Sequence, residues 1–160
     1  MSILGLARPE LLAMAPYSSA RMEAGAGDIW LNANESPWNP IALGRINRYP
    51  EPQPPQLLAA LGEVYGVDPS RLFVGRGSDE PIDLLTRAFC RAGLDSVLIA
   101  PPTFGMYAVA AQVQGAKVRS VPLQAERGFA FDAEALRAAV DANTRIVYAC
   151  TPNNTTGNST

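Results

Sequence analysis

Two adjacent asparagines near the end of the chain are the residues best placed to do chemistry. Asn153 and Asn154 follow the apolar run 146–150 and lie in a turn rich in threonine, proline and glycine, residues 151–157. A strand that ends in such a turn places amide side chains at the carboxyl edge of a sheet, where α/β proteins bind ligands. The same amides could instead hold the turn through hydrogen bonds to its backbone. The residues alone leave both roles open.

A glycine-rich segment, residues 75–80, lies between a short apolar run and an expected helix. Free backbone N–H groups at the start of a helix, together with the positive end of its dipole, can bind a phosphate or a carboxylate. Ser78 or Asp79 can cap this helix, and an ordinary capped helix is the alternative interpretation. The segment is neither a dinucleotide-binding fingerprint nor a phosphate-binding loop with a following lysine.

Aromatic residues occupy two further positions of interest. Phe104, in residues 101–107, lies between an expected strand and an expected helix, where its ring could lie flat on a planar ligand or belong to the core. Tyr49, in residues 47–50, places a hydroxyl in a loop made rigid by Pro50, which by itself indicates no function.

The elements that would position these residues alternate along the chain. Strands are expected at 72–74, 96–100, 117–121 and 145–150, and helices at 57–65, 79–91, 104–114 and 132–140. This alternation predicts an α/β fold with a parallel or mixed sheet and crossover helices. Eight prolines make residues 1–56 an irregular arm, so we expect a domain of residues 57–160 preceded by this arm.

Composition excludes several classes of function. The net charge of −2 and the absence of any basic run argue against nucleic acid or a membrane surface as a partner. The chain has no histidine, which excludes histidine metal sites and Ser-His or Cys-His dyads within it. Neither a signal peptide nor a membrane-spanning segment is recognisable, so a cytoplasmic location with Cys90 and Cys150 reduced is expected.

Six segments in this order resemble histidinol-phosphate aminotransferases, which are pyridoxal-phosphate enzymes of fold type I. They are residues 31–35, 47–50, 75–80, 87–90, 101–107 and 151–157, and the resemblance extends from about Tyr17 to Gly157. It implies that the chain is the N-terminal part of the large, pyridoxal-phosphate-binding domain of such an enzyme, with a mainly parallel sheet.

The resemblance implies a set of contacts to the cofactor. The backbone amides of Ser78 and Asp79 would hold its phosphate, and Phe104 would lie against its pyridine ring. Asn154 matches the asparagine that donates a hydrogen bond to the phenolic oxygen of the ring. These assignments agree with the chemistry expected from the residues themselves.

Two tyrosines are implied to act outside this set. Tyr49 resembles the tyrosine that reaches the cofactor phosphate of the neighbouring subunit, which implies a homodimer for the complete protein. Tyr17 resembles a tyrosine of the N-terminal arm on the substrate side. The implied substrate is a small phosphorylated amino acid.

Two departures from the family pattern matter. Thr155 stands where the family has a proline, and a threonine fixes the turn less firmly because proline presets φ. The family's Schiff-base lysine lies beyond the asparagine motif, so no catalytic residue can be assigned in this chain. Lys117, the only lysine, lies at the start of an expected strand, away from the carboxyl edge. We therefore expect this chain alone to be inactive, with weak or absent binding of pyridoxal phosphate.

The predicted function of the complete protein is transamination between glutamate and imidazole-acetol phosphate in histidine biosynthesis. A related pyridoxal-phosphate enzyme, such as a threonine-phosphate decarboxylase, is the enzymatic alternative. A non-catalytic fragment, or one half of a split enzyme, is the alternative from a different class. In either fragment, the last strand would present an unpaired apolar edge.

Overall fold

The computed structural model describes residues 3–18, 29–42, 44 and 46–159. The chain forms two compact units. One comprises Ala15–Val74, and the other combines Met1–Met14 with Gly75–Thr160. The domain boundary near residue 56 stays a prediction.

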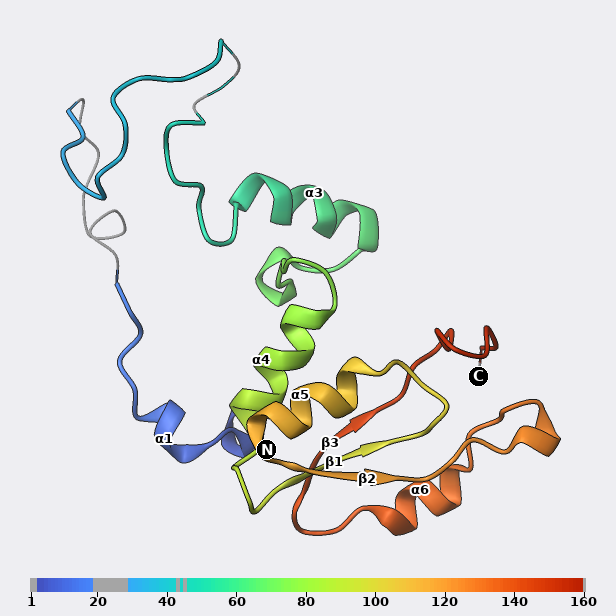
Figure 1. Cartoon of the computed structure of the whole chain (residues 1–160). Coiled ribbons are helices and arrows are strands. Elements are labelled where there is room, and N and C mark those ends of the chain that lie inside the picture. Colours follow the sequence, from blue (N-terminus) through green and yellow to red (C-terminus); the bar gives the residue numbers. More distant parts are fainter. Residues whose placement is uncertain (1–2, 19–28, 43, 45, 160) are drawn as a thin grey trace. The chain divides into compact units, whose positions relative to one another are not determined.

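A three-stranded parallel sheet forms the centre of the second unit (Figure 1). Its strands are ordered β2-β1-β3, with β1 at Ser96–Ile99, β2 at Lys117–Ser120 and β3 at Thr144–Tyr148. Val97 in the central strand is opposite Val118 on one side and Ile146 on the other. The α/β fold and the predicted parallel sheet are confirmed.

Helices provide the crossovers that parallel strands require. α5 (Met106–Gln114) connects β1 to β2, and α6 (Ala133–Ala139) precedes β3. α4 (Asp79–Phe89) precedes β1 and contacts α5 and β3. In Figure 1, α4 and α5 lie on one side of the sheet and α6 on the other. Asp132 caps α6 by accepting a hydrogen bond from the Ala135 N–H at 2.9 Å.

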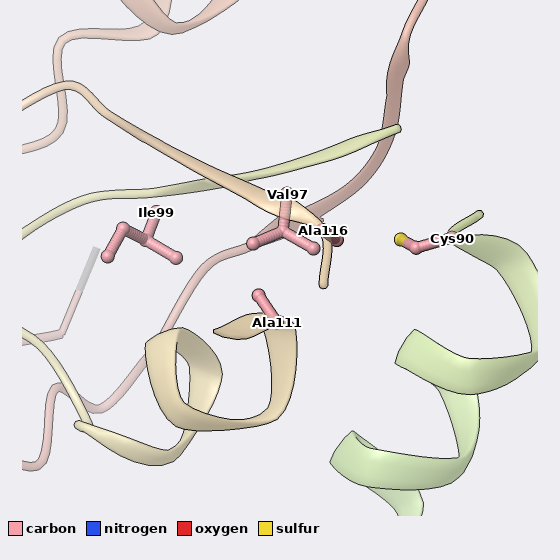
Figure 2. Close-up of a cluster of buried hydrophobic side chains, with 5 residues drawn as sticks. All are labelled: Cys90, Val97, Ile99, Ala111 and Ala116. Atoms are coloured by element: carbon pink, nitrogen blue, oxygen red, sulfur yellow. The ribbon is translucent and has the colours of Figure 1, made fainter. Parts of the chain in front are cut away.

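The core lies between the sheet and α5. All four residues of β1 are buried, as expected for the central strand of a parallel sheet. Figure 2 shows the cluster between the strand and the helices, which consists of Cys90, Val97, Ile99, Ala111 and Ala116. Leu98 points to the opposite face and is also fully buried. Burial raises the pKa of the Cys90 thiol to about 11, so this cysteine stays protonated and acts as a small apolar side chain.

The N-terminal segment of the same unit packs on the end of α4. It contains a 3-10 turn at Ile3–Leu6 and the short helix α1 at Pro9–Leu12. The backbone N–H of Arg8 donates to the Ala88 carbonyl at 2.9 Å, and its guanidinium donates to the Arg87 carbonyl at 3.0 Å. Because the last carbonyls of a helix lack partners within it, Arg8 stabilises the end of α4.

The unit Ala15–Val74 contains α3 (Pro55–Tyr65) and a 3-10 turn at Pro69–Arg71. Gly66 ends α3 in the left-handed conformation, at φ +63°. The other remaining 3-10 turn, Ala125–Arg127, belongs to the sheet-containing unit. Among the described helices, none is long and apolar enough to cross a membrane.

The strand predicted at residues 72–74 is wrong. Leu72 is extended, but residues 72–74 form no ladder, and the side chain of Gln53 satisfies the backbone of Val74 instead. The Val74 N–H donates to Gln53 Oε1 at 2.8 Å, and the Val74 carbonyl accepts from Gln53 Nε2 at 2.9 Å. A side-chain amide thus takes the place of a neighbouring strand, which apolar patterning cannot reveal.

Replacing Gly115 with alanine should lower the free energy of unfolding by about 1–2 kcal/mol. Gly115 ends α5 at φ +78°, and an added Cβ would lie 3.2 Å from the Cβ of Ala92. Gly128→Ala is a matched control, because Gly128 also has a positive φ, +66°, but has open space around it. Urea unfolding of both variants separates the backbone effect from the contact. An equal loss of unfolding free energy in the two variants would mean that the structure around Ala92 adjusts to the added Cβ without cost.

Candidate functional site

A loop follows the carboxyl end of β1 and another follows that of β3, and a hydrogen bond from Asn153 connects the two loops. Asn153 is 4% exposed, and its Nδ2 donates to the carbonyl oxygen of Pro102 at 2.9 Å. The loop that follows β1 and carries Phe104 is therefore tied directly to the turn that follows β3. This is the sheet edge at which the sequence predicts a ligand site.

Asn154 differs from its neighbour because its side chain is exposed. Its backbone N–H donates to the Cys150 sulfur at 3.4 Å, which holds the residue in the turn. Within the described residues its side-chain amide makes no hydrogen bond. The two asparagines thus divide the roles that the sequence left open: Asn153 holds the turn, and Asn154 has an amide available for a ligand.

The start of α4 presents backbone donors. Ser78 and Asp79 are exposed, and their N–H groups have no hydrogen-bond partner in the part of the chain that the structure describes. Gly77 precedes them at φ +82° with open space where a Cβ would stand. The helix has eleven residues, long enough for its dipole to favour an anion at this end. This geometry can hold a phosphate.

The predicted side-chain cap at Ser78 or Asp79 is wrong. Ser78 occupies the N-cap position of α4, but its side chain makes no capping hydrogen bond, and Asp79 is the first residue of the helix. The Glu80 carboxylate accepts the N–H of Arg76, a residue before the helix, at 2.7 Å. The Glu80 carboxylate also pairs with the Arg76 guanidinium at 3.2 Å. The hydrogen bond from the Arg76 backbone, followed by the one from its side chain, lowers the pKa of Glu80. Within the described residues, the backbone N–H groups of Ser78 and Asp79 therefore stay available to a ligand.

A shallow hollow of about 620 Å³ adjoins this helix start. Asp79 and Glu80 of α4 line it together with Met106, Val109 and Ala110 of α5. Leu84 and Val113 line it too, so the hollow runs along both helices from the start of α4. In the described residues, no group of histidine, cysteine, aspartate or glutamate could hold a metal ion.

Three aromatic rings connect the site loop to the sheet. Phe104 is half-buried and meets Tyr107 edge to face, with ring centroids 5.8 Å apart. Tyr107 stacks on Tyr148 of β3, with centroids 4.5 Å apart and planes 6° from parallel. Burial is the main reason that the pKa of Tyr107 rises to about 12, so this hydroxyl stays neutral. The contact with Tyr107 therefore holds the Phe104 ring against the stacked pair. The contact of Phe104 with a cofactor stays a prediction.

Tyr148 extends this connection to α4. Its hydroxyl donates to the Ile82 carbonyl at 3.1 Å and lies 2.8 Å from the Thr86 hydroxyl, which is fully buried. Sequence reasoning did not single out Tyr107, Tyr148 or Thr86. The only available signal was the position of Tyr107 within the segment 101–107.

Tyr17 and Tyr49 belong to the other unit, Ala15–Val74, and are 87% and 63% exposed. A carboxylate holds the Tyr49 loop: Glu35, whose side chain is 2% exposed, accepts the Tyr49 N–H at 2.8 Å and pairs with Arg48 at 2.9 Å. A hollow of about 570 Å³ adjoins them, lined by Trp30, Ile46 and Pro50 among others. The roles assigned to both tyrosines stay predictions.

The sequence matches the family Aminotransferase class I and II over residues 29–160. The chain belongs to this family. Solved structures of aminotransferases agree with the fold: N-succinyldiaminopimelate aminotransferase from Mycobacterium tuberculosis aligns with a TM-score of 0.62 and 33% identity, over 68% of this chain and 30% of that one. A putative histidinol-phosphate aminotransferase from Erwinia carotovora atroseptica aligns with a TM-score of 0.60 and 30% identity, over 71% and 33%.

Within the family, the chain is similar to curated histidinol-phosphate aminotransferases. A histidinol-phosphate aminotransferase from Stenotrophomonas maltophilia is 52% identical over 97% of this chain. One from Xylella fastidiosa is 51% identical over 98% of it. The chain covers 44% of the length of each of these two relatives.

Proposed function

We propose that this chain is the N-terminal portion of a histidinol-phosphate aminotransferase. The observation that carries the proposal is the 52% identity to a histidinol-phosphate aminotransferase over 97% of the chain. In the complete protein, the reaction would exchange an amino group between glutamate and imidazole-acetol phosphate. The complete protein would be a homodimer, with Tyr49 reaching the cofactor phosphate of the neighbouring subunit and Tyr17 on the substrate side.

The residues present fit pyridoxal phosphate. The unpartnered N–H groups of Ser78 and Asp79, at the positive end of α4, would hold the phosphate, and the absence of a side chain at Gly77 lets the backbone approach it. The exposed amide of Asn154 would donate to the phenolic oxygen, and Phe104 would lie against the ring. When bound, pyridoxal phosphate supplies the electron sink for chemistry at the carbon that bears the amino group.

The contribution of this chain is therefore to bind and orient. Backbone donors fix the anionic end of the cofactor, and a neutral side-chain donor sets the charge on the ring oxygen. The proton-transferring amine of the family is not assigned to any residue of this chain. Lys117 is the first residue of β2, at the amino end of the strands, and cannot serve at the carboxyl edge.

An assay of the complete protein that contains this sequence tests the proposal. Turnover of histidinol phosphate with 2-oxoglutarate, measured as glutamate formed, is the expected result. Release of carbon dioxide from threonine phosphate, without formation of glutamate, would contradict it and favour the decarboxylase.

A second measurement addresses the alternative of a non-catalytic or split product. Detection of the native protein in its source cells with an antibody against this sequence gives its intact mass. We expect a species substantially heavier than 17.0 kDa. A species of 17.0 kDa would contradict this expectation and direct the search to a partner that supplies the missing lysine.

A further inference from the structure

The turn that carries Asn154 departs from its family at one position, and the structure offers a physical compensation. The resemblance to the family implies a proline at the position of Thr155. The Thr155 N–H donates to Oδ1 of Asn153 at 3.1 Å. Proline has no N–H and could not form this bond. The substitution therefore removes a backbone constraint and adds a hydrogen bond at the same place.

Asn153 is fully engaged in this turn and beyond it. Its Nδ2 donates to Pro102 in the other loop at 2.9 Å. Its backbone N–H donates to the Asn158 carbonyl, and its own carbonyl accepts from the Gly157 N–H, both at 2.8 Å. With 4% of its surface exposed, the residue cannot replace these partners with water at no cost.

We propose that Asn153 is a positioning residue, whose side-chain oxygen does for this turn what the proline does in the family. Its oxygen fixes the backbone on the C-terminal side of Asn154, and its nitrogen fixes that turn against the loop of Phe104. The two groups proposed to contact the cofactor ring are thereby held at a set separation. This inference rests on the proposed cofactor site and extends it to a residue that makes no contact with the cofactor.

The proposal predicts coupling between positions 153 and 155. In Asn153→Ala, both loops lose their shared anchor and the Thr155 N–H loses its acceptor. In Thr155→Pro, the ring restores the constraint on φ, but Oδ1 of Asn153 is left without this donor. The Pro102 carbonyl loses its donor in both backgrounds. In the double variant, however, the proline constrains the turn and needs no acceptor from Asn153, so Asn153→Ala should cost less there than in the Thr155 background.

The experiment is a double-mutant cycle in the complete protein, with the affinity for pyridoxal phosphate as its readout. We expect Asn153→Ala to weaken binding about tenfold beside Thr155 and only about twofold beside proline. The fivefold difference between the two backgrounds corresponds to the one hydrogen bond from the Thr155 N–H, since a buried hydrogen bond contributes roughly a fivefold to tenfold effect. Equal losses in the two backgrounds would overturn the proposal. Thr155→Ser, which keeps the N–H, should behave like the unchanged protein. Asn143→Ala, at an exposed asparagine before β3, is the matched control.

A spectroscopic readout separates positioning from general loss of structure. The absorbance of the bound cofactor depends on the charge of its phenolic oxygen, which Asn154 is proposed to stabilise. In Asn153→Ala the pH at which this absorbance changes should rise, and in the double variant it should return towards its original value. Faster hydrogen exchange of the Thr155 amide in Asn153→Ala should accompany the shift. An unchanged absorbance profile, or failure of the unchanged protein to bind pyridoxal phosphate, would refute the role of Asn153.

These readouts do not depend on the identity of the substrate. If the complete protein fails to turn over histidinol phosphate but the cycle shows coupling, the proposed reaction is wrong and the role of Asn153 stands. If turnover is observed and the cycle is additive, the proposed reaction stands and the role of Asn153 is wrong.

Discussion

Replacing Asp95 with alanine should lower the free energy of unfolding by about 3 kcal/mol, at the lower end of the range for breaking a buried ion pair. Asp95 is fully buried immediately before β1, and its carboxylate accepts from Arg91 Nε at 2.8 Å and from Arg145 Nε at 2.9 Å. It also accepts the Arg91 backbone N–H at 2.8 Å. Without it, two guanidinium groups lose their shared partner. Their side chains remain 37% and 26% exposed, so water offsets part of the cost.

Urea unfolding of the variant measures this loss, with Asp83→Ala as the control. Asp83 pairs with Arg87 at 2.7 Å on the outer face of α4, where the two side chains are 36% and 53% exposed. An exposed pair of this kind contributes about 0–1 kcal/mol. A loss of stability for Asp95→Ala no larger than for the control would mean that the ion pairs of Asp95 with Arg91 and Arg145 contribute no more than an exposed pair.

The contribution of Asp95 should also depend on pH. Hydrogen bonds from Arg91, followed by those from Arg145, hold the pKa of Asp95 well below its usual range in the folded protein. The folded pKa is therefore lower than the unfolded value of about 4, so the stabilisation is present above pH 4 and is lost as the pH falls towards the folded pKa. The difference in stability between the unchanged protein and Asp95→Ala should shrink between pH 5 and pH 3, approximately. A difference that stays constant over this range would contradict the pKa shift.

The elements with strong local signals could be predicted from the sequence. The apolar runs of β1 and β3 and the helical spacing of α3 identify those elements within a few residues, since burial alone dictates them. The predicted strand at 72–74 failed because its backbone is satisfied by the Gln53 side chain, 21 residues earlier. The predicted side-chain cap of α4 also failed, because Ser78 takes the N-cap position without a capping hydrogen bond from its side chain.

For the candidate site, too, one part could be predicted from the sequence and another could not. Types and spacing pointed to the segments that carry Ser78, Asp79, Phe104 and the two asparagines, since loops at strand ends carry local composition signals. The choice of Asn154 over Asn153 came from the resemblance to the family. What positions them could not be predicted, because it depends on pairs far apart in the chain. The bond from Asn153 to Pro102 spans 51 residues, and the stacking of Tyr107 on Tyr148 joins a helix to a strand. Such pairs leave no periodic pattern in the sequence.

The 160-residue chain by itself should show no transamination above background, which is the largest effect expected of any measurement on it. Exchange of an amino group through pyridoxal phosphate requires an amine to hold the cofactor and move a proton. The only lysine, Lys117, is paired with Ser96 at the first position of the two strands, and its backbone N–H donates to the Asp95 carbonyl. It therefore belongs to the amino edge of the sheet, a whole strand away from Asn154.

Reduction with borohydride in the presence of pyridoxal phosphate, followed by peptide mapping, checks this placement directly. We expect no modification of Lys117 beyond that of the same chain denatured in urea, where the lysine reacts as any exposed amine would. Preferential labelling of Lys117 in the folded chain, with turnover lost in Lys117→Arg, would contradict it. Since arginine keeps the positive charge but cannot form the covalent link, that variant separates an electrostatic role from a catalytic one.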